Sequence, residues 1–363
     1  MARGINAAGD LPVAQLLDGS DAAQLFKDYV EVVKAQNDKQ DTLVSLLTFK
    51  TTLASDAVLQ SIDAGELELA SEYGQPVGIR PGLTSITLGY KFDWYDLATR
   101  MTARWLADAS KEQADALTNA ALAADNKTTF KAVMGSLFNN TARVNEQGVA
   151  VQPLWNNDGT VPPPHDGKTF AATHQHYVTS GTANLTAAGG QIAVDALIEN
   201  VREHGYDAKG GQLLLLVNRQ EANQIRGFRA GASGSFDFIP GEGAPARITS
   251  EVVVGQTPPA KLGEQPLIGA YGPAWVAENN LIPAGYVVCV VTRGTNSSQN
   301  PIGFREHPTT NLRGLRIVPG PNPDYPLTSA FYVRGFGVGV RHRGAAAVMQ
   351  VTASPTYTAP AGF

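Results

Sequence analysis

A glycine–lysine–threonine triplet at positions 167–169 is the first stretch whose residue types could do chemistry, because the same triplet ends a phosphate-binding loop. Such a loop holds phosphate with backbone N–H groups and needs another glycine five residues before its last glycine. That position holds Pro162, inside a run of prolines. We therefore interpret the triplet as part of an ordinary loop and not as a nucleotide site.

Three alternating glycines near the end of the chain, Gly335, Gly337 and Gly339, invite comparison with a dinucleotide-binding loop. That loop requires a third glycine three residues after the second, and the two candidate positions hold Val340 and His342. In an extended segment, alternating glycines leave one face flat, so that another piece of chain can pack closely against it. We predict a strand whose other face is apolar, with the side chains of Phe336, Val338 and Val340.

Two histidines, His174 and His176, lie on the same side of any extended segment and could bind a metal ion. A zinc site needs three or four converging ligands. The histidine closest to the pair in the sequence is His165, and the polar loop shows no further partners that would complete such a site. We therefore predict a surface or interface role for the pair, with no metal ion and no cofactor.

The remaining catalytic patterns are incomplete. The Gly-x-Ser-x-Gly elbow that presents a catalytic serine is broken at its last position by Ser235. The single cysteine, Cys289, lies in an apolar run, so we expect it to be buried, and it has no partner for an internal disulfide. The sequence therefore predicts no catalytic residue, and a protein that is not an enzyme.

Composition limits the possible partners. The chain has 363 residues, of which 43% are hydrophobic and 17% charged, and its formal net charge is -5. A chain of this length can bury a large core without disulfides. The acidic balance is unlike that of proteins that hold nucleic acid through many phosphate contacts. We expect neither a secretory signal nor a membrane-spanning segment, because no apolar run is long enough.

Hydrophobic periodicity predicts an α+β chain. A capping pattern from Ser110 to Gln113 marks the start of its longest helix, and Asn218 caps a short one. The helices are expected near residues 21–33, 93–105, 111–138 and 187–204. The strands are expected at residues 212–217, 248–254, 267–277, 286–292 and 331–351.

Two alternating segments, around residues 65–70 and 85–92, flank a turn-rich stretch and predict a long β-hairpin. An isolated hairpin is marginally stable, so its apolar face needs another surface, and another subunit could supply it. The apolar side chains of this hairpin are Leu67, Leu69, Ile86, Leu88, Tyr90 and Phe92.

The order of these elements resembles that of the major capsid proteins of tailed bacteriophages. The resemblance extends from about residue 60 to 352, and it is closest to capsid proteins of phages that infect actinobacteria. The stretches that carry it are LELASEYGQPVGIRP, LGYKFDWYDLATR, AALAADNKTTFKAVMGSLFNNTAR, PLIGAYGPAWVAENNLIPAGY and YPLTSAFYVRGFGVGVRHRGAAAVMQV.

The resemblance implies the Johnson fold. Carried onto this chain, it implies an N-terminal arm over residues 1–60, an E-loop over 61–92, a P-domain over 93–184 with a spine helix over 111–138, an A-domain over 185–320, returning P-domain strands over 321–352, and a tail over 353–363. It also implies a structural protein that assembles as hexamers and pentamers into an icosahedral shell around double-stranded DNA. The shell would belong to the virion and assemble in the host bacterial cytoplasm. Its partners would be other copies of this chain, a portal, and scaffolding or decoration proteins.

Within such a shell, the apolar hairpin residues would contact a neighbouring subunit. Arg334, Arg341 and Arg343 would form charge pairs between subunits or face the DNA, and we favour pairs between subunits because guanidinium groups suit carboxylates. Some relatives cross-link their subunits through a lysine of the E-loop. Here Lys91 lies at the base of the hairpin, and no lysine occurs from residue 60 to 90. We therefore expect a non-covalent shell.

Two alternatives remain open. One is an encapsulin-type nanocompartment, which has the same fold and encloses cargo enzymes. The other is a soluble α/β enzyme built around residues 213–229 that uses His174 and His176.

Overall fold

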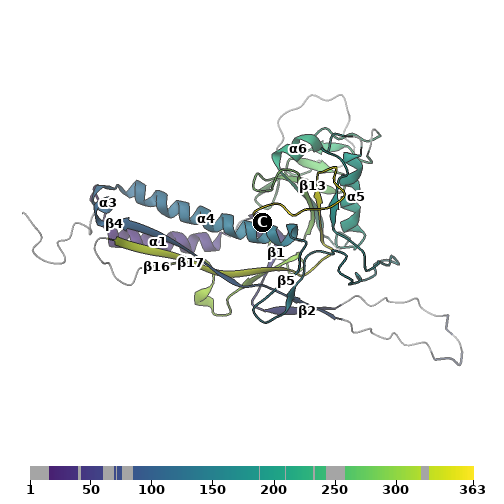
Figure 1. The fold of residues 1–363 in the computed structure, drawn as a ribbon, viewed down its shortest axis with the longest axis horizontal. Coiled ribbons are helices and arrows are strands. Elements are labelled where there is room, and N and C mark those ends of the chain that lie inside the picture. Colours follow the sequence, from purple (N-terminus) through teal and green to yellow (C-terminus); the bar gives the residue numbers. More distant parts are fainter. Residues whose placement is uncertain are drawn as a thin grey trace, which may run out of the picture.

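The computed structural model in Figure 1 has two parts, a long narrow part that we call the shaft and a compact part at one end that we call the body. Helices and strands occur in both parts, as the α+β prediction requires. The structure describes residues 16–39, 42–59, 69–70, 72–75, 85–187, 189–208, 210–231, 234–242, 258–319 and 327–363. Among these residues, no helix is both long and apolar enough to span a membrane.

One long helix, α4 (Lys111–Phe138), runs along the shaft beside a five-stranded sheet. It begins with the predicted capping box, in which Ser110 and Gln113 bond to each other's backbone. Its last turns pack onto the apolar face of the sheet, so the predicted helix and the predicted apolar strand face are both confirmed. The strands of this sheet are β1 (Thr48–Thr51), β4 (Asp93–Thr102), β15 (Ile302–Glu306), β16 (Arg316–Pro319) and β17 (Leu327–Val340).

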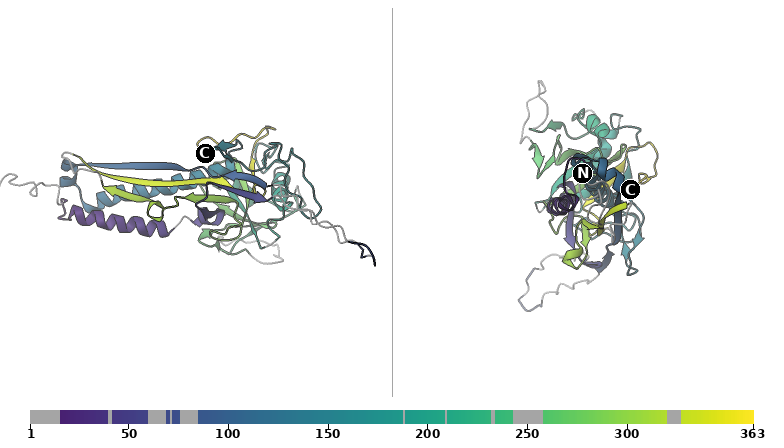
Figure 2. Two further views of the ribbon diagram at one scale, coloured as in Figure 1. Left: turned by 90° about the horizontal axis from the view of Figure 1, so that it is seen from below. Right: turned by 90° about the vertical axis from the view of Figure 1, so that its left-hand side faces the viewer.

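Helix α1 (Ala22–Asp38) packs beside β16 and α4 and thickens the shaft. Figure 2 shows this helix running parallel to the long strands. The short helix α2 (Thr42–Leu47) leads into β1 and is buried along most of its length. The chain ends against the same core, since the ring of Phe363 lies 5.1 Å from that of Phe138.

The prediction of a helix over residues 93–105 is wrong for most of its length. Residues 93–102 form β4, which pairs antiparallel with ten residues of β17, and only α3 (Ala103–Asp108) is helical. Leu97 and Met101 are four residues apart, a spacing that places them on one face of a helix and also on one face of a strand. The long partner strand therefore decides the structure.

The predicted flat face of β17, at its alternating glycines, is confirmed. A Cβ at Gly337 would lie 1.3 Å from the carbonyl oxygen of Lys91, and one at Gly339 would lie 2.5 Å from that of Gly89. The backbone that enters β4 therefore rests directly on β17, with no room for side chains between them.

The predicted strand over residues 331–351 divides into two strands in different sheets. β17 ends at Val340, and β18 (Ala346–Gln350) pairs with β14 (Tyr286–Thr292) in the body. The prediction of one strand over residues 331–351 is therefore wrong. The chain instead connects the shaft to the body at this point.

The body contains a seven-stranded sheet whose centre is fully buried. α5 (Gly190–Arg202) and α6 (Arg219–Ile225) pack on one face, and α4 packs on the other. The buried strand over 212–217, the buried Cys289 and the Asn218 cap are as predicted. The strand order is β7 (Tyr177–Thr179), β18, β14, β8 (Gln212–Val217), β13 (Ala274–Glu278), β12 (Gly269–Tyr271) and β9 (Phe238–Pro240).

One detail of the body differs from prediction. Residues 267–277 form two strands, β12 and β13, that turn at Gly272. The buried face of α5 comprises Val194, Leu197, Ile198 and Val201, whereas Ile192 is 55% exposed. The predicted strand at 248–254 lies outside the described residues.

The hairpin begins earlier in the chain than predicted. β2 (Ser55–Leu59) pairs antiparallel with β3 (Ser85–Gly89), so pairing starts before residue 61. Small two-stranded sheets complete the structure: β5 (Arg143–Val144) with β6 (Ala150–Val151), and β10 (Lys261–Leu262) with β11 (Gln265–Pro266). A 3-10 turn, η2, spans Thr310–Leu312.

Candidate assembly surfaces

Two of the predicted hairpin contacts belong to the subunit's own core. Leu88 and Tyr90 are 1% and 0% exposed. The ring of Tyr90 lies over Gly303, where a Cβ would come within 2.2 Å of it. The prediction that these two residues contact another subunit is therefore wrong. They fix the base of the hairpin to the shaft sheet of their own subunit.

The other described hairpin residues remain accessible. Ile86 and Phe92 are half-buried, and the Phe92 ring lies 5.4 Å from that of Trp94. Leu69 and Tyr73 are 98% and 93% exposed. Leu67 lies outside the described residues.

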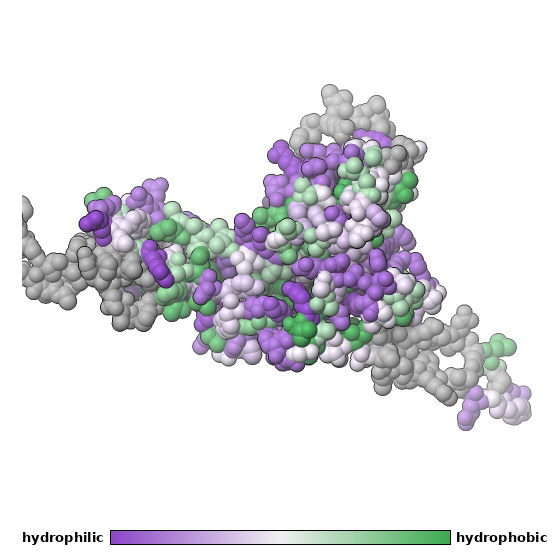
Figure 3. All heavy atoms as spheres, in the orientation of Figure 1, coloured by the Kyte–Doolittle hydropathy of each residue, from purple (hydrophilic) through white to green (hydrophobic). Residues whose placement is uncertain are grey.

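Strand β4 presents exposed apolar side chains on both faces, Trp94 on one and Tyr95 and Leu97 on the other, which the helix prediction did not anticipate. Trp94, Tyr95 and Leu97 are 51%, 37% and 42% exposed on this strand. Among the described residues, β4 pairs only with β17, so its other edge carries unpaired backbone groups. Figure 3 shows apolar side chains gathered on the shaft. The sequence feature that could have predicted this strand is the aromatic pair Trp94–Tyr95, because aromatic residues have high strand propensity.

The predicted arginines form ion pairs, but within the chain. Arg334 pairs with Asp125 of α4, and both side chains are largely buried. Burial raises the pKa of Asp125 above its ordinary value, and the guanidinium of Arg334 opposes this shift. Arg341 donates from Nε to Asp56 of β2 at 2.7 Å, which ties the hairpin base to the turn after β17.

Arg343 is the most buried of the three, at 3% exposure. Its guanidinium donates to the carbonyl oxygen of Pro153 at 2.8 Å and pairs with Asp158. It also lies 4.1 Å from the ring centre of Trp155. Burial alone would raise the pKa of Asp158, but hydrogen bonds from Thr160 and Arg343 outweigh it and lower that pKa.

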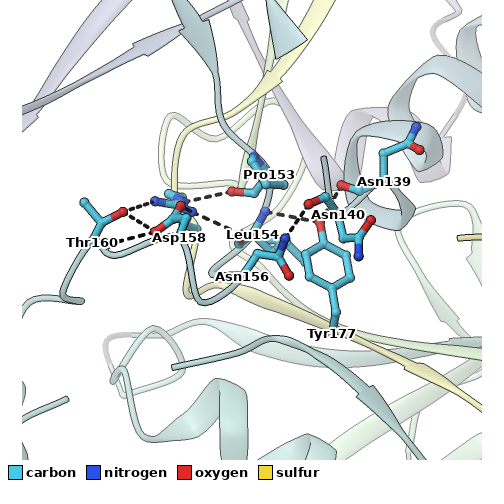
Figure 4. Close-up of polar contacts among 9 residues, drawn as sticks. Asn139, Asn140, Pro153, Leu154, Asn156, Asp158, Thr160 and Tyr177 are labelled. Atoms are coloured by element: carbon cyan, nitrogen blue, oxygen red, sulfur yellow. Dashed lines mark hydrogen bonds and ion pairs between the residues drawn. The ribbon is translucent and has the colours of Figure 1, made fainter. Parts of the chain in front are cut away.

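Figure 4 shows the loop segment that Arg343 organises. Tyr177 donates to the carbonyl oxygen of Asn139 at 2.7 Å and accepts from the backbone N–H of Leu154 at 3.3 Å. The side chain of Asn156 donates to the carbonyl oxygen of Asn140. This network joins the end of α4 to the connection that enters the body. The prediction that the arginines pair between subunits or face DNA is therefore corrected: all three stabilise the subunit itself.

The prediction of a surface role for the histidine pair is wrong for His176, and the alternative of an interface role stays a prediction. His176 is fully buried, and His174 and His204 converge on it from the loop and from the end of α5. Burial lowers the pKa of His176 well below its usual value and lowers that of His204 to about 3. The sequence analysis missed His204, because it lies 28 residues from His176 and no spacing rule connects the two.

Comparisons with known proteins agree with this architecture. No family model matches the sequence, and no curated protein does. A solved structure from Mycobacterium phage Patience is similar at a TM-score of 0.73 with 36% identity, over 99% of this chain and 96% of that chain. A chain from the mature capsid of bacteriophage PhiM1 has a TM-score of 0.54 and 8% identity, over 87% and 88% of the two chains. One from the capsid of a native GTA particle has a TM-score of 0.50 and 16% identity, over 86% and 91%.

The identity and coverage of the mycobacteriophage match place the chain in a family, and the two more distant matches share its fold. The chain belongs to the major capsid proteins of tailed bacteriophages, which have the Johnson fold. It is a structural protein of the capsid shell.

Proposed function

We propose that this chain assembles as hexamers and pentamers into an icosahedral shell that encloses a double-stranded DNA genome. The observation that carries the proposal is the exposure of Leu69 and Tyr73 on the hairpin, at 98% and 93%. Full burial of each side chain against a neighbour would contribute about 1.5–3 kcal/mol. Because the contact would recur at every subunit, it would stabilise a shell without covalent bonds.

The receiving surface that we propose is the shaft of the neighbouring subunit. Trp94, Tyr95 and Leu97 offer apolar area there, and the free edge of β4 offers backbone groups for pairing. Lys91 forms an ion pair with Asp93 at 2.9 Å at the hairpin base, which favours a shell without lysine cross-links.

The division into domains follows from this proposal. The shaft would be the peripheral P-domain, with α4 as its spine, and the body would be the A-domain at the capsomer centre. The resemblance gives residues 1–60 as the N-terminal arm and 61–92 as the E-loop. Because β2 at residues 55–59 already pairs with β3, the E-loop would begin at residue 55 and the arm would end before it. The strand β18 at residues 346–350 would belong to the A-domain.

Assembly in the host bacterial cytoplasm, with a portal and with scaffolding or decoration proteins, completes the proposal. DNA would contact the inner wall weakly, because the chain is acidic overall and its three predicted arginines are paired with aspartates.

Negative-stain electron microscopy of the purified protein, with size-exclusion chromatography beside it, tests the proposal. We expect closed shells, or hexamers and pentamers that close into them. A small oligomer at every concentration and salt tested would contradict self-assembly. Particles from infected cells that hold protein cargo and no DNA would instead favour the nanocompartment alternative.

A further inference from the structure

Three histidines meet in the body with their Nε2 atoms at the corners of a triangle. The distances between His174 and His176, between His174 and His204, and between His176 and His204 are each 3.0 Å. Two of the residues come from the loop before β7, and His204 follows α5. No other group of three metal-binding side chains converges in this way among the described residues.

Hydrogen bonds among the three rings do not account for this arrangement. In a neutral imidazole, each Nε2 either carries a proton or offers a lone pair. In a triangle of three such atoms, at least two must therefore be alike, so at least one 3.0 Å contact brings together two donors or two acceptors. A metal ion removes the conflict, because it binds the lone pairs of all three nitrogens.

The surroundings of His176 fix its lone pair toward the centre of the triangle. Its Nδ1 lies 2.6 Å from the carbonyl oxygen of Ala346, which can only accept, so Nδ1 carries the proton and Nε2 does not. The same arrangement orients histidine ligands in known metal sites.

The size of the triangle suits a divalent transition-metal ion. Its centre is about 1.7 Å from each corner, so an ion at the usual zinc–imidazole distance of 2.0–2.1 Å would lie about 1 Å out of the plane. The nitrogen–metal–nitrogen angles would then be about 94°, which leaves room for a fourth ligand. Glu203 lies beside His174, with Oε1 3.2 Å from Nε2 of that ring, and its Oε2 pairs with Lys168. The Phe170 ring stacks on His204 at 4.4 Å and shields the site.

We propose that His174, His176 and His204 bind one Zn²⁺ ion per subunit, with water or Glu203 as the fourth ligand. The ion joins the loop that enters the body, the end of α5 and, through Ala346, the strand β18. Its role is structural, because it ties together segments of the body that are connected mainly by loop residues. The proposal concerns a single subunit and does not depend on shell assembly.

The test is the metal content of untagged protein, measured by elemental analysis after dialysis against metal-free buffer. We expect about one zinc per subunit. After removal of the metal with a chelator, added Zn²⁺ should raise the Tm, because it binds the folded state. Co²⁺ in its place should produce the intense visible absorption of a low-coordinate cobalt site with nitrogen ligands.

Two matched variants distinguish the loss of a proposed zinc ligand from the loss of another histidine. His174→Gln should lose stoichiometric zinc and the Tm response, and His165→Gln, which changes a nearby histidine outside the triangle, should keep both. If His174→Gln does not fold, the wild-type protein still decides the matter through its zinc content, its Tm response and its cobalt spectrum. A wild-type protein without bound zinc, whose Tm does not respond to Zn²⁺, would overturn the proposal.

Discussion

At the scale of single residues, the three arginines show what sequence can and cannot specify. Guanidinium groups were expected to meet carboxylates, and each of them does. Their partners lie 209, 285 and 185 residues away along the chain, so only the fold determines that the pairs form within one subunit. The fold also brings the three histidines together, since His204 reaches His174 and His176 only through the packing of α5.

The Arg334–Asp125 pair supports a prediction about stability. Arg334→Met should destabilise the unassembled subunit by about 3–5 kcal/mol, because it leaves a buried carboxylate without its partner. Arg334→Met combined with Asp125→Asn should be less destabilised than Arg334→Met alone. Urea unfolding of all the variants measures both effects. Equal stability of Arg334→Met and wild type would show that the pair contributes little.

His342 supports a prediction about pH. Burial, followed by the neighbouring Arg341, lowers the pKa of His342 in the folded chain to about 4, below its ordinary value of 6.5. The unfolded chain therefore binds more protons between these values, so the stabilising contribution is present above pH 6.5 and is lost as the pH falls toward 4. Between pH 7.5 and pH 5, wild type should lose about 1–3 kcal/mol more than His342→Gln. Parallel stability curves for the two proteins would refute this.

At the scale of elements, the shaft shows where local pattern suffices. Helix α4 was predictable because its cap and its periodicity agree, and the flat face of β17 was predictable because glycines alternate in it. Strand β4 was not predictable, because the spacing of its apolar residues fits both a helix and a strand. Its pairing partner, β17, is more than 200 residues away in the sequence. The division of 331–351 between two sheets likewise has no local signal.

The alternating glycines of β17 support a prediction at this scale. Gly337→Ala should cost about 3 kcal/mol or more, because its Cβ would overlap the backbone of Lys91. Gly241→Ala is a suitable control, since its Cβ would find its nearest neighbour at an ordinary contact distance of 3.5 Å. Thermal unfolding followed by circular dichroism compares the two. If both variants unfold at the same temperature, the close approach at Gly337 is not needed for stability.

At the scale of the whole molecule, the subunit is elongated, and its hairpin carries exposed apolar side chains. Such a shape buries less of its own surface than a compact subunit of the same length. The residues that the sequence analysis assigned to contacts between subunits therefore divide into two groups. Leu88 and Tyr90 hold the hairpin base within the subunit, while Leu69 remains available to a neighbour. Tyr73, which the sequence analysis did not assign to such contacts, is exposed as well.

The most direct test of assembly through the hairpin is electron microscopy of a Leu69→Asp, Tyr73→Asp double variant beside wild type. Both side chains are exposed, so the variant should fold with an unchanged circular dichroism spectrum. A Leu69→Met, Tyr73→Phe variant keeps the apolar surface and serves as the control. We predict closed shells from wild type and from the control, and only unassembled subunits from the charged variant. Closed shells of normal size and stability from the charged variant would contradict the account.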